Sequence, residues 1–200
     1  MTLPSTLEMV AAAFGILSVF LGTRQIIWSW PTALVNVSLY AWYFFDQRLY
    51  ALMALQGFFA SVSIYGWYEW LRGGAGHTAL RVSRTPRPLA VGLAAFAAGG
   101  SVLLAFLLDR YTEDPSPGID GTLAIVSLGA QWMMARKYLE NWLVWIGVNC
   151  VSVPFFFLRA DYATTVQYAV FLGLAISGYR QWKRSLQEGD RAPAPGPGAR

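Results

Sequence analysis

The sequence of 200 residues has one cysteine, one histidine and few charged side chains, which make up 13% of the chain. A disulfide needs two cysteines and a structural zinc site usually needs four Cys or His ligands, so neither can form within one chain. Nucleotide-binding P-loops and the G-x-S-x-G nucleophile motif are also missing. A soluble domain carries about twice this charged fraction. We therefore expect no enzyme, no catalytic residue, no cofactor and no metal site.

Long uncharged stretches are abundant instead, and hydrophobic residues make up 56% of the chain. Seven such stretches lie between charged residues, at 9–23, 25–45, 49–68, 88–108, 121–135, 141–158 and 162–179. A membrane-spanning helix needs about 20 mostly apolar residues, and a flanking charged residue can extend a shorter stretch by reaching the interface. The sequence therefore predicts an all-α membrane protein with seven transmembrane helices and lipid as its surroundings.

The basic residues are distributed unequally between the two sides that seven helices define. Twelve of the 15 Lys and Arg fall on the side of the carboxyl terminus, and Arg48, Arg110 and Arg159 fall on the other. The positive-inside rule then places the carboxyl terminus in the cytoplasm and the amino terminus outside a plasma (inner) membrane. Topology explains the basic composition, so we expect no nucleic-acid partner. Residues 185–200 are polar and rich in Pro and Gly, and we expect a disordered cytoplasmic tail there.

An internal repeat relates the first three spans to the last three. A shift of 112 residues aligns Arg24, Trp30, Phe59, Gly66 and Trp70 with Arg136, Trp142, Phe171, Gly178 and Trp182. Repeats of three helices keep the same orientation only if a further helix separates them. The transmembrane domain, residues 1–184, is thus predicted as 3+1+3: two parallel repeats at 7–72 and 119–184, with a linker helix at 88–108. Transporters built this way bind substrate near the midplane, between the repeats.

Polar and aromatic side chains at membrane depth are the candidates for such a site. Trp142, Trp145 and Asn149 fall at about 0°, 300° and 340° around a helix, so they share one face. Two flat rings and an amide suit an aromatic, polar ligand. Alternatively, Trp142 is an interfacial anchor and Asn149 a hydrogen-bond staple between helices. Asn36 and Tyr40 lie in the equivalent region of the other repeat, which favours a shared cavity.

Further amides occur in three other spans, at Gln56, Gln131 and Gln167. Each must face another helix or water, because an unsatisfied amide costs several kcal/mol in hydrocarbon. Five further tryptophans lie near span ends and are expected mostly in the aromatic belt: Trp28, Trp30, Trp67, Trp70 and Trp182. No carboxylate is expected inside a span, so no group is expected to carry a coupling proton.

Two stretches carry a family resemblance. One runs from Asn36 to Trp70 and includes N-V-S-L-Y-A-W-Y-F-F and I-Y-G-W-Y-E-W, and the other is R-K-Y-L-E-N-W-L-V-W-I-G-V-N from Arg136 to Asn149. They resemble the PnuC family of vitamin-precursor transporters, whose best-known members carry nicotinamide riboside. The resemblance implies a fold related to SWEET transporters, facilitated diffusion with trapping by cytoplasmic phosphorylation, and a homotrimer. It also implies that the W-x-x-W-x-x-x-N residues line the substrate site, with Gln131, Asn36 and Gln56 as further contacts.

The cargo stays open at this stage. Related members are thought to carry thiamine, riboflavin or deoxynucleosides, and all of these combine an aromatic ring with polar groups. A membrane protein that binds the same ligand without transporting it is the alternative from another class.

Overall fold

The computed structural model describes residues 6–113 and 115–191, and nearly all of them are helical. The elements are α1 (Thr6–Thr23), α2 (Ser29–Asp46), α3 (Tyr50–Arg72), a short 3₁₀ turn (Ala75–His77), α4 (Arg87–Tyr111), α5 (Pro117–Ala135), α6 (Asn141–Leu158) and α7 (Tyr162–Arg191). Prolines in the first turns of α4 and α5 suit a helix start, where the missing N–H is no loss. The all-α fold class expected from the sequence is confirmed.

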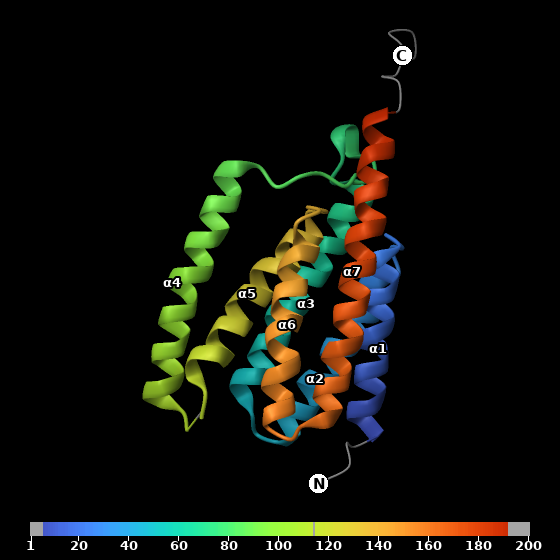
Figure 1. Ribbon diagram of the computed structural model, residues 1–200. Coiled ribbons are helices and arrows are strands. Elements are labelled where there is room, and N and C mark those ends of the chain that lie inside the picture. The colour runs from blue at the N-terminus through green and yellow to red at the C-terminus, as the bar shows by residue number, and fades with distance from the viewer. Residues whose placement is uncertain (1–5, 114, 192–200) are drawn as a thin grey trace.

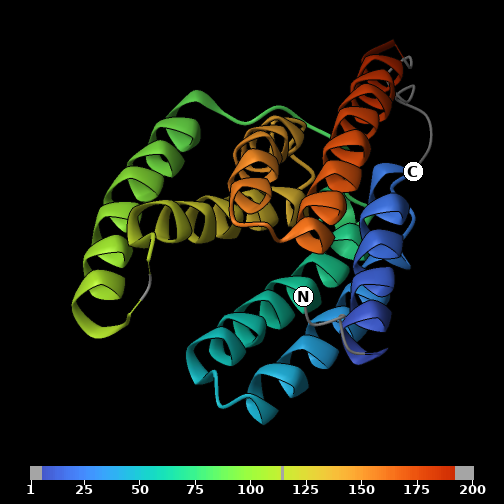
Figure 2. The ribbon, with the colours of Figure 1, turned by 60° about the horizontal axis from the view of Figure 1, so that its bottom comes forward.

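Six of the helices form a closed ring. Contacts run from α1 to α2, α3, α5, α6 and α7 in turn and back to α1. The remaining helix, α4, packs on α5 outside this ring, and Figures 1 and 2 show it at the edge of the molecule, away from α1 and α7. The first residue of α1 and the last residue of α7 lie at opposite ends of the helix ring (Figure 1). This is the 3+1+3 arrangement, with the linker helix kept apart from the two groups of three.

The turns show the repeat in the backbone itself. Five non-glycine residues of the described chain adopt the left-handed region, and four of them form two pairs separated by 112 positions. The pairs are Gln25 (φ 57°) with Lys137 (φ 51°), and Arg48 (φ 60°) with Ala160 (φ 57°). Left-handed backbone is uncommon outside glycine. Finding it at equivalent positions means that the α1–α2 and α5–α6 turns, and likewise α2–α3 and α6–α7, have the same design.

The outer surface is apolar, as a membrane protein requires. Helices α1, α4 and α6 are long and apolar enough to cross a membrane by length and composition. The side chain of Val102 on α4 is 72% exposed, and α4 has no buried residue at all. The other four helices hold Asn36, Gln56, Gln131 and Gln167 and most of the Trp and Tyr. These side chains lower the mean hydropathy of the four helices, and several of them face the inside of the ring.

Four tryptophans fill the core at the end of the molecule that holds the carboxyl terminus. Trp30, Trp70, Trp142 and Trp182 are at most 3% exposed. Their rings form a chain of edge contacts, with centroids 5.2 Å apart for Trp30–Trp70, 5.8 Å for Trp70–Trp182 and 5.4 Å for Trp142–Trp182. The expected belt position is therefore wrong for Trp30, Trp70 and Trp182, because the helices converge here and bury them. Trp28 and Trp67 are exposed, as a belt position requires.

The polar tail begins later than the sequence predicts. Helix α7 continues to Arg191, so residues 185–191 are helical rather than disordered. Leu186 packs against the tryptophan core. Gln187 and Glu188, which follow it, are good helix formers. The rest of the tail, residues 192–200, lies outside the described residues.

Candidate substrate-binding site

A cavity of about 700 Å³ lies inside the helix ring. All six helices of the ring contribute to its wall, and two leucines of α4 complete it. Every residue proposed for the site lines this cavity: Trp142, Trp145, Asn149, Gln131, Asn36, Tyr40 and Gln56. Its volume lies within the range of about 300–1,000 Å³ that small-molecule pockets occupy.

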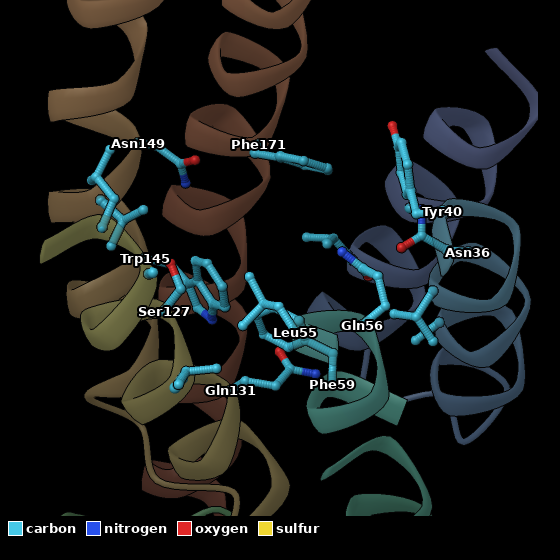
Figure 3. Close-up of a pocket in the computed structure, with 18 of the residues that line it drawn as sticks. Asn36, Tyr40, Leu55, Gln56, Phe59, Ser127, Gln131, Trp145, Asn149 and Phe171 are labelled. Atoms are coloured by element: carbon cyan, nitrogen blue, oxygen red, sulfur yellow. The ribbon is translucent and has the colours of Figure 1, made fainter. Parts of the chain in front are cut away.

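The α6 wall carries the two tryptophans and the amide that share a helix face. Trp145 is half-buried, and its ring lies in the cavity opposite α2 (Figure 3). Trp142 touches the cavity too, but its ring is locked in an edge contact with Trp182. Asn149 is only 2% exposed and lies one turn beyond Trp145, near Phe171 (Figure 3). Trp145 is thus the ring best placed to stack on a ligand, and Trp142 is its support.

The α2 wall combines helix packing with ligand access. The side-chain amide of Asn36 donates a 2.7 Å hydrogen bond to the Ala11 carbonyl on α1. A Cβ at Gly15 would stand 3.0 Å from that amide nitrogen, so the glycine leaves the space that Asn36 needs. The side-chain nitrogen of Asn36 therefore joins α2 to α1, and its side-chain oxygen is the group that could accept a hydrogen bond from a ligand. Tyr40, one turn further on, stacks on Phe44 with centroids 5.9 Å apart.

The glutamines of α3 and α5 line adjoining walls of the cavity. Gln131 is on the same wall as Ser127, and Gln56 projects beside Leu55 from α3 (Figure 3). Ser63, near the tryptophan core, adds a buried hydroxyl without a partner among the described residues. Gln167 is the exception, because it is not among the residues that line the cavity. The cavity thus offers amides and hydroxyls around a mostly apolar and aromatic wall.

Comparison with known proteins decides the family. Residues 5–184 match the family described as "Nicotinamide mononucleotide transporter". The chain is 32% identical over 214 aligned positions to the nicotinamide riboside transporter PnuC of Escherichia coli K12, covering 94% of this chain and 90% of that protein. The chain belongs to this family of membrane transporters.

Two further relatives frame the fold and the range of cargo. The riboflavin/roseoflavin transporter RibM of Streptomyces davaonensis is 29% identical, with 88% of this chain and 83% of that protein covered. The crystal structure of the vitamin B3 transporter PnuC superimposes with a TM-score of 0.71 at 24% identity, covering 91% of this chain and 82% of that one. At this identity the structural likeness shows the fold, which is the expected one.

Several cavity residues of this family member escape prediction from sequence. Phe59, Ser127, Phe156, Tyr168 and Phe171 all line the cavity. Phe59 and Phe171 carry a signal, because the 112-residue shift aligns them. Phe156 and Tyr168 stack with centroids 5.3 Å apart, a contact between α6 and α7 that spacing alone does not reveal.

A carboxylate also lines the cavity, which corrects the expectation that no span holds one. Asp120 marks the boundary of an uncharged stretch in the sequence, but α5 begins at Pro117 and includes it. It lies at the end of the cavity that faces the amino terminus, and its carboxylate is 3.7 Å from the guanidinium of Arg159.

The opposite end of the cavity is closed by the tryptophan core and an ion pair. The Arg136 guanidinium donates to the Glu69 carboxylate at 2.8 Å and to the Tyr65 hydroxyl at 3.2 Å. The hydrogen bond to Tyr65 is the main cause that raises the pKa of Arg136. These contacts join α3 to the α5–α6 turn beside the tryptophan core.

Proposed function

We propose that the protein takes up nicotinamide riboside by facilitated diffusion. Membership of the family and the relative in Escherichia coli support this cargo. The observation that carries the proposal is the cavity, in which Trp145 offers a stacking face and Asn149, Gln131 and Gln56 offer hydrogen bonds. A nicotinamide ring matches the aromatic wall, and its carboxamide and the ribose hydroxyls match the amides.

The absence of an energy-coupling device supports facilitated diffusion. The sequence has no P-loop for ATP. Two carboxylates near the span ends are committed to protein contacts: Glu69 binds Arg136, and Glu140 accepts hydrogen bonds of 2.8 Å from the backbone N–H and the hydroxyl of Thr85. Asp120 is the cavity carboxylate, so it is the first residue to replace if uptake proves to depend on protons.

Net accumulation then needs a second step inside the cell. A carrier that only equilibrates its cargo is drained on the cytoplasmic side when a kinase adds phosphate, because the added phosphate dianion does not suit a cavity whose charged lining residue, among those described, is the carboxylate of Asp120. Trapping by phosphorylation is the simplest partner reaction for this kind of carrier.

The test is uptake into liposomes that contain the purified protein and nothing else. At zero membrane potential, radiolabelled nicotinamide riboside should reach equal concentrations on both sides. A proton or sodium gradient, with the potential clamped, should leave that plateau unchanged. A plateau that rises several-fold with either gradient contradicts facilitated diffusion. A protein that binds the cargo but admits none of it would be a receptor.

Riboflavin is a second candidate cargo, because RibM covers most of this chain at 29% identity. Both cargoes are aromatic rings with a polyhydroxylated chain or ring, so stacking on Trp145 does not separate them. Competition of unlabelled riboflavin, thiamine and deoxynucleosides against labelled nicotinamide riboside ranks the candidates directly.

The proposed orientation has the carboxyl terminus in the cytoplasm, supported by the unequal distribution of Lys and Arg. A reporter fused after Arg184 should read as cytoplasmic, and one inserted in the Tyr111–Gly118 loop should read as external. Both reporters on the same side would mean that the count of seven spans is wrong. We also propose a homotrimer on the family resemblance, which the mass of the detergent-solubilised protein tests.

A further inference from the structure

Asp120 is the one charged residue among those that line the cavity within the described residues. Its side chain is 30% exposed, which leaves it in reach of a molecule inside the cavity. Phe156 and Tyr168 line the same cavity and stack on each other. A carboxylate beside aromatic faces is the combination that attracts a flat cation, since both the charge and the ring quadrupoles favour it.

The ion-pair partner of Asp120 is held mainly by other groups. The Arg159 guanidinium donates a 2.7 Å hydrogen bond to the Ser116 hydroxyl and lies 4.3 Å above the ring of Phe155. Its distance to the Asp120 carboxylate is 3.7 Å, longer than a hydrogen bond. Arg159 can therefore keep its place while Asp120 also interacts with a second cation.

The whole amino-terminal end of the molecule has the same sign as Asp120. Among the described residues, six carboxylates belong to this end, against three arginines. These carboxylates are Glu8, Asp46, Asp109, Glu113, Asp120 and Asp161. The opposite end of the described chain carries four carboxylates and 11 basic residues. A mouth with an excess of negative charge raises the local concentration of cations and speeds their association.

We propose that Asp120 is a specificity-determining residue that selects a positively charged ring over a neutral ring of the same shape. The inference rests on the proposed function, since the nicotinamide ring of the riboside is a pyridinium cation. It adds a residue and a criterion, the charge of the cargo, that stacking and amide contacts do not supply. The carboxylate of Asp120 binds the cation first, at its own end of the cavity, and the cation then moves to the ring of Trp145.

A structural role for Asp120 makes different predictions. A carboxylate in the first turn of a helix stabilises the helix through its dipole, and the pair with Arg159 connects α5 to the α6–α7 turn. If that were its whole role, neutralising it would lower stability and affect every cargo alike. The two roles are separated by comparing the cation with its uncharged 1,4-dihydro form, which carries one more hydride at C4 of the ring and is otherwise the same molecule.

The experiment titrates purified wild type and Asp120→Asn with nicotinamide riboside and with its uncharged 1,4-dihydro form. Asp120→Asn should weaken binding of the cation by about tenfold, which is the cost of losing a partly solvated charge pair. Binding of the neutral form should change by less than about twofold. Asp120→Glu should restore most of the affinity for the cation. Asp109→Asn is the matched control, because it removes a charge from the same end outside the cavity.

The following outcomes would overturn the proposed role of Asp120. Equal losses for both ligands, together with a lower melting temperature, would make Asp120 structural and overturn the inference. Equal effects of Asp109→Asn and Asp120→Asn would reduce the selection to the general field of this end. Unchanged affinity for the cation would also overturn it, while binding of nicotinamide riboside by the wild type would leave the proposed cargo standing. A wild type that binds neither ligand would overturn both.

Discussion

The two halves of the helix ring agree closely at one end of the cavity and differ within it. At the closed end, the indole N–H of Trp70 donates to the Met134 carbonyl at 3.2 Å, and that of Trp182 donates to the Gly22 carbonyl at 3.0 Å. Both the donors and the acceptors are 112 residues apart. The last helix of each half is thus hydrogen-bonded to the first helix of the other half. We call this symmetric pair of contacts at the tryptophan core the symmetric joint.

The cavity wall does not keep this symmetry. The 112-residue shift pairs Trp145 with Ala33, and both line the cavity. The amides are displaced by one position, since Asn149 pairs with Val37 and Asn36 pairs with Val148. A ring on one wall and a small residue on the other leave room for one flat ligand. The helix contacts around the tryptophan core are therefore the same in both halves, whereas the residues that line the cavity differ. An asymmetric cavity suits a cargo that has no internal symmetry.

The strongest test of the symmetric joint is a pair of glycine substitutions. A Cβ at Gly66 would lie 2.4 Å from the Trp30 ring, and one at Gly178 would lie 2.6 Å from the Trp142 ring. Both rings are buried among other tryptophans and have no room to move. We expect Gly66→Ala and Gly178→Ala each to cost about 3 kcal/mol of unfolding free energy, the upper end for overpacking a core. Thermal unfolding in detergent measures it.

Gly57→Ala is the control, because nothing lies within 4 Å of a Cβ there. In a helix interior this change should stabilise the protein by up to about 1 kcal/mol. If one of the two core substitutions were tolerated and the other were not, the joint would not be energetically symmetric.

The asymmetric wall is tested by removing its stacking ring. Trp145→Ala should weaken binding of the cargo by about tenfold to a hundredfold, by analogy with aromatic stacking on nucleic-acid bases, which is worth about 1–3 kcal/mol per ring. The loss should leave the melting temperature close to that of the wild type, since Trp145 lies at the cavity surface. Trp142→Ala should show the reverse pattern, with a smaller loss of affinity and a larger loss of stability, because its ring belongs to the core.

Ligand titration and thermal unfolding of both variants measure this difference. Unchanged affinity in both variants would remove the α6 tryptophans from the proposed site.

Much of this comparison is visible in the sequence, and the rest depends on packing. Periodicity places Trp145 and Asn149 on one helix face, and the repeat aligns Gly66 with Gly178 because the same contact is made twice. The role of Trp30, Trp70 and Trp182 was predicted wrongly, since proximity to a span end does not say whether helices converge there. Asp120 was missed because a charge was used to mark the end of a span, although α5 starts three residues earlier. Contacts between helices, such as the stack of Phe156 on Tyr168, have no local signal.

A charged contact distinguishes the two halves on the side of the tryptophan core. Arg136 pairs with Glu69, whereas the equivalent residues are Arg24, which lies over the ring of Phe20, and Gln181, which donates to Ser177 within α7. Glu69→Gln makes this half resemble the other. We expect a loss of about 1–2 kcal/mol of unfolding free energy, because the ion pair becomes a hydrogen bond from the guanidinium to a neutral amide oxygen.

The control for Glu69→Gln is Glu188→Gln, which removes a carboxylate on the exposed part of α7 and should be neutral in thermal unfolding. If Glu69→Gln were neutral too, the ion pair would contribute orientation of the turn rather than stability.

The smallest expected difference concerns the turn residues Gln25 and Lys137, which share a left-handed backbone but not a charge. The Lys137 ammonium is 6% exposed, donates to the Leu80 carbonyl at 2.9 Å and lies 4.5 Å from the Trp70 ring centroid. Burial lowers its pKa from 10.5 to about 8. The unfolded chain therefore binds this proton more tightly than the folded one, so stability rises with pH between 8 and 10.5 and is lost as pH falls from 10.5 to 8. From pH 7 to pH 9 the wild type should gain about 1 kcal/mol of unfolding free energy from this group alone.

Lys137→Gln, which copies the residue of the other turn, should remove that pH dependence. Melting curves of both proteins at pH 7, 8 and 9 measure it. Parallel pH profiles would mean that the ammonium titrates normally and that the two turns are electrostatically equivalent.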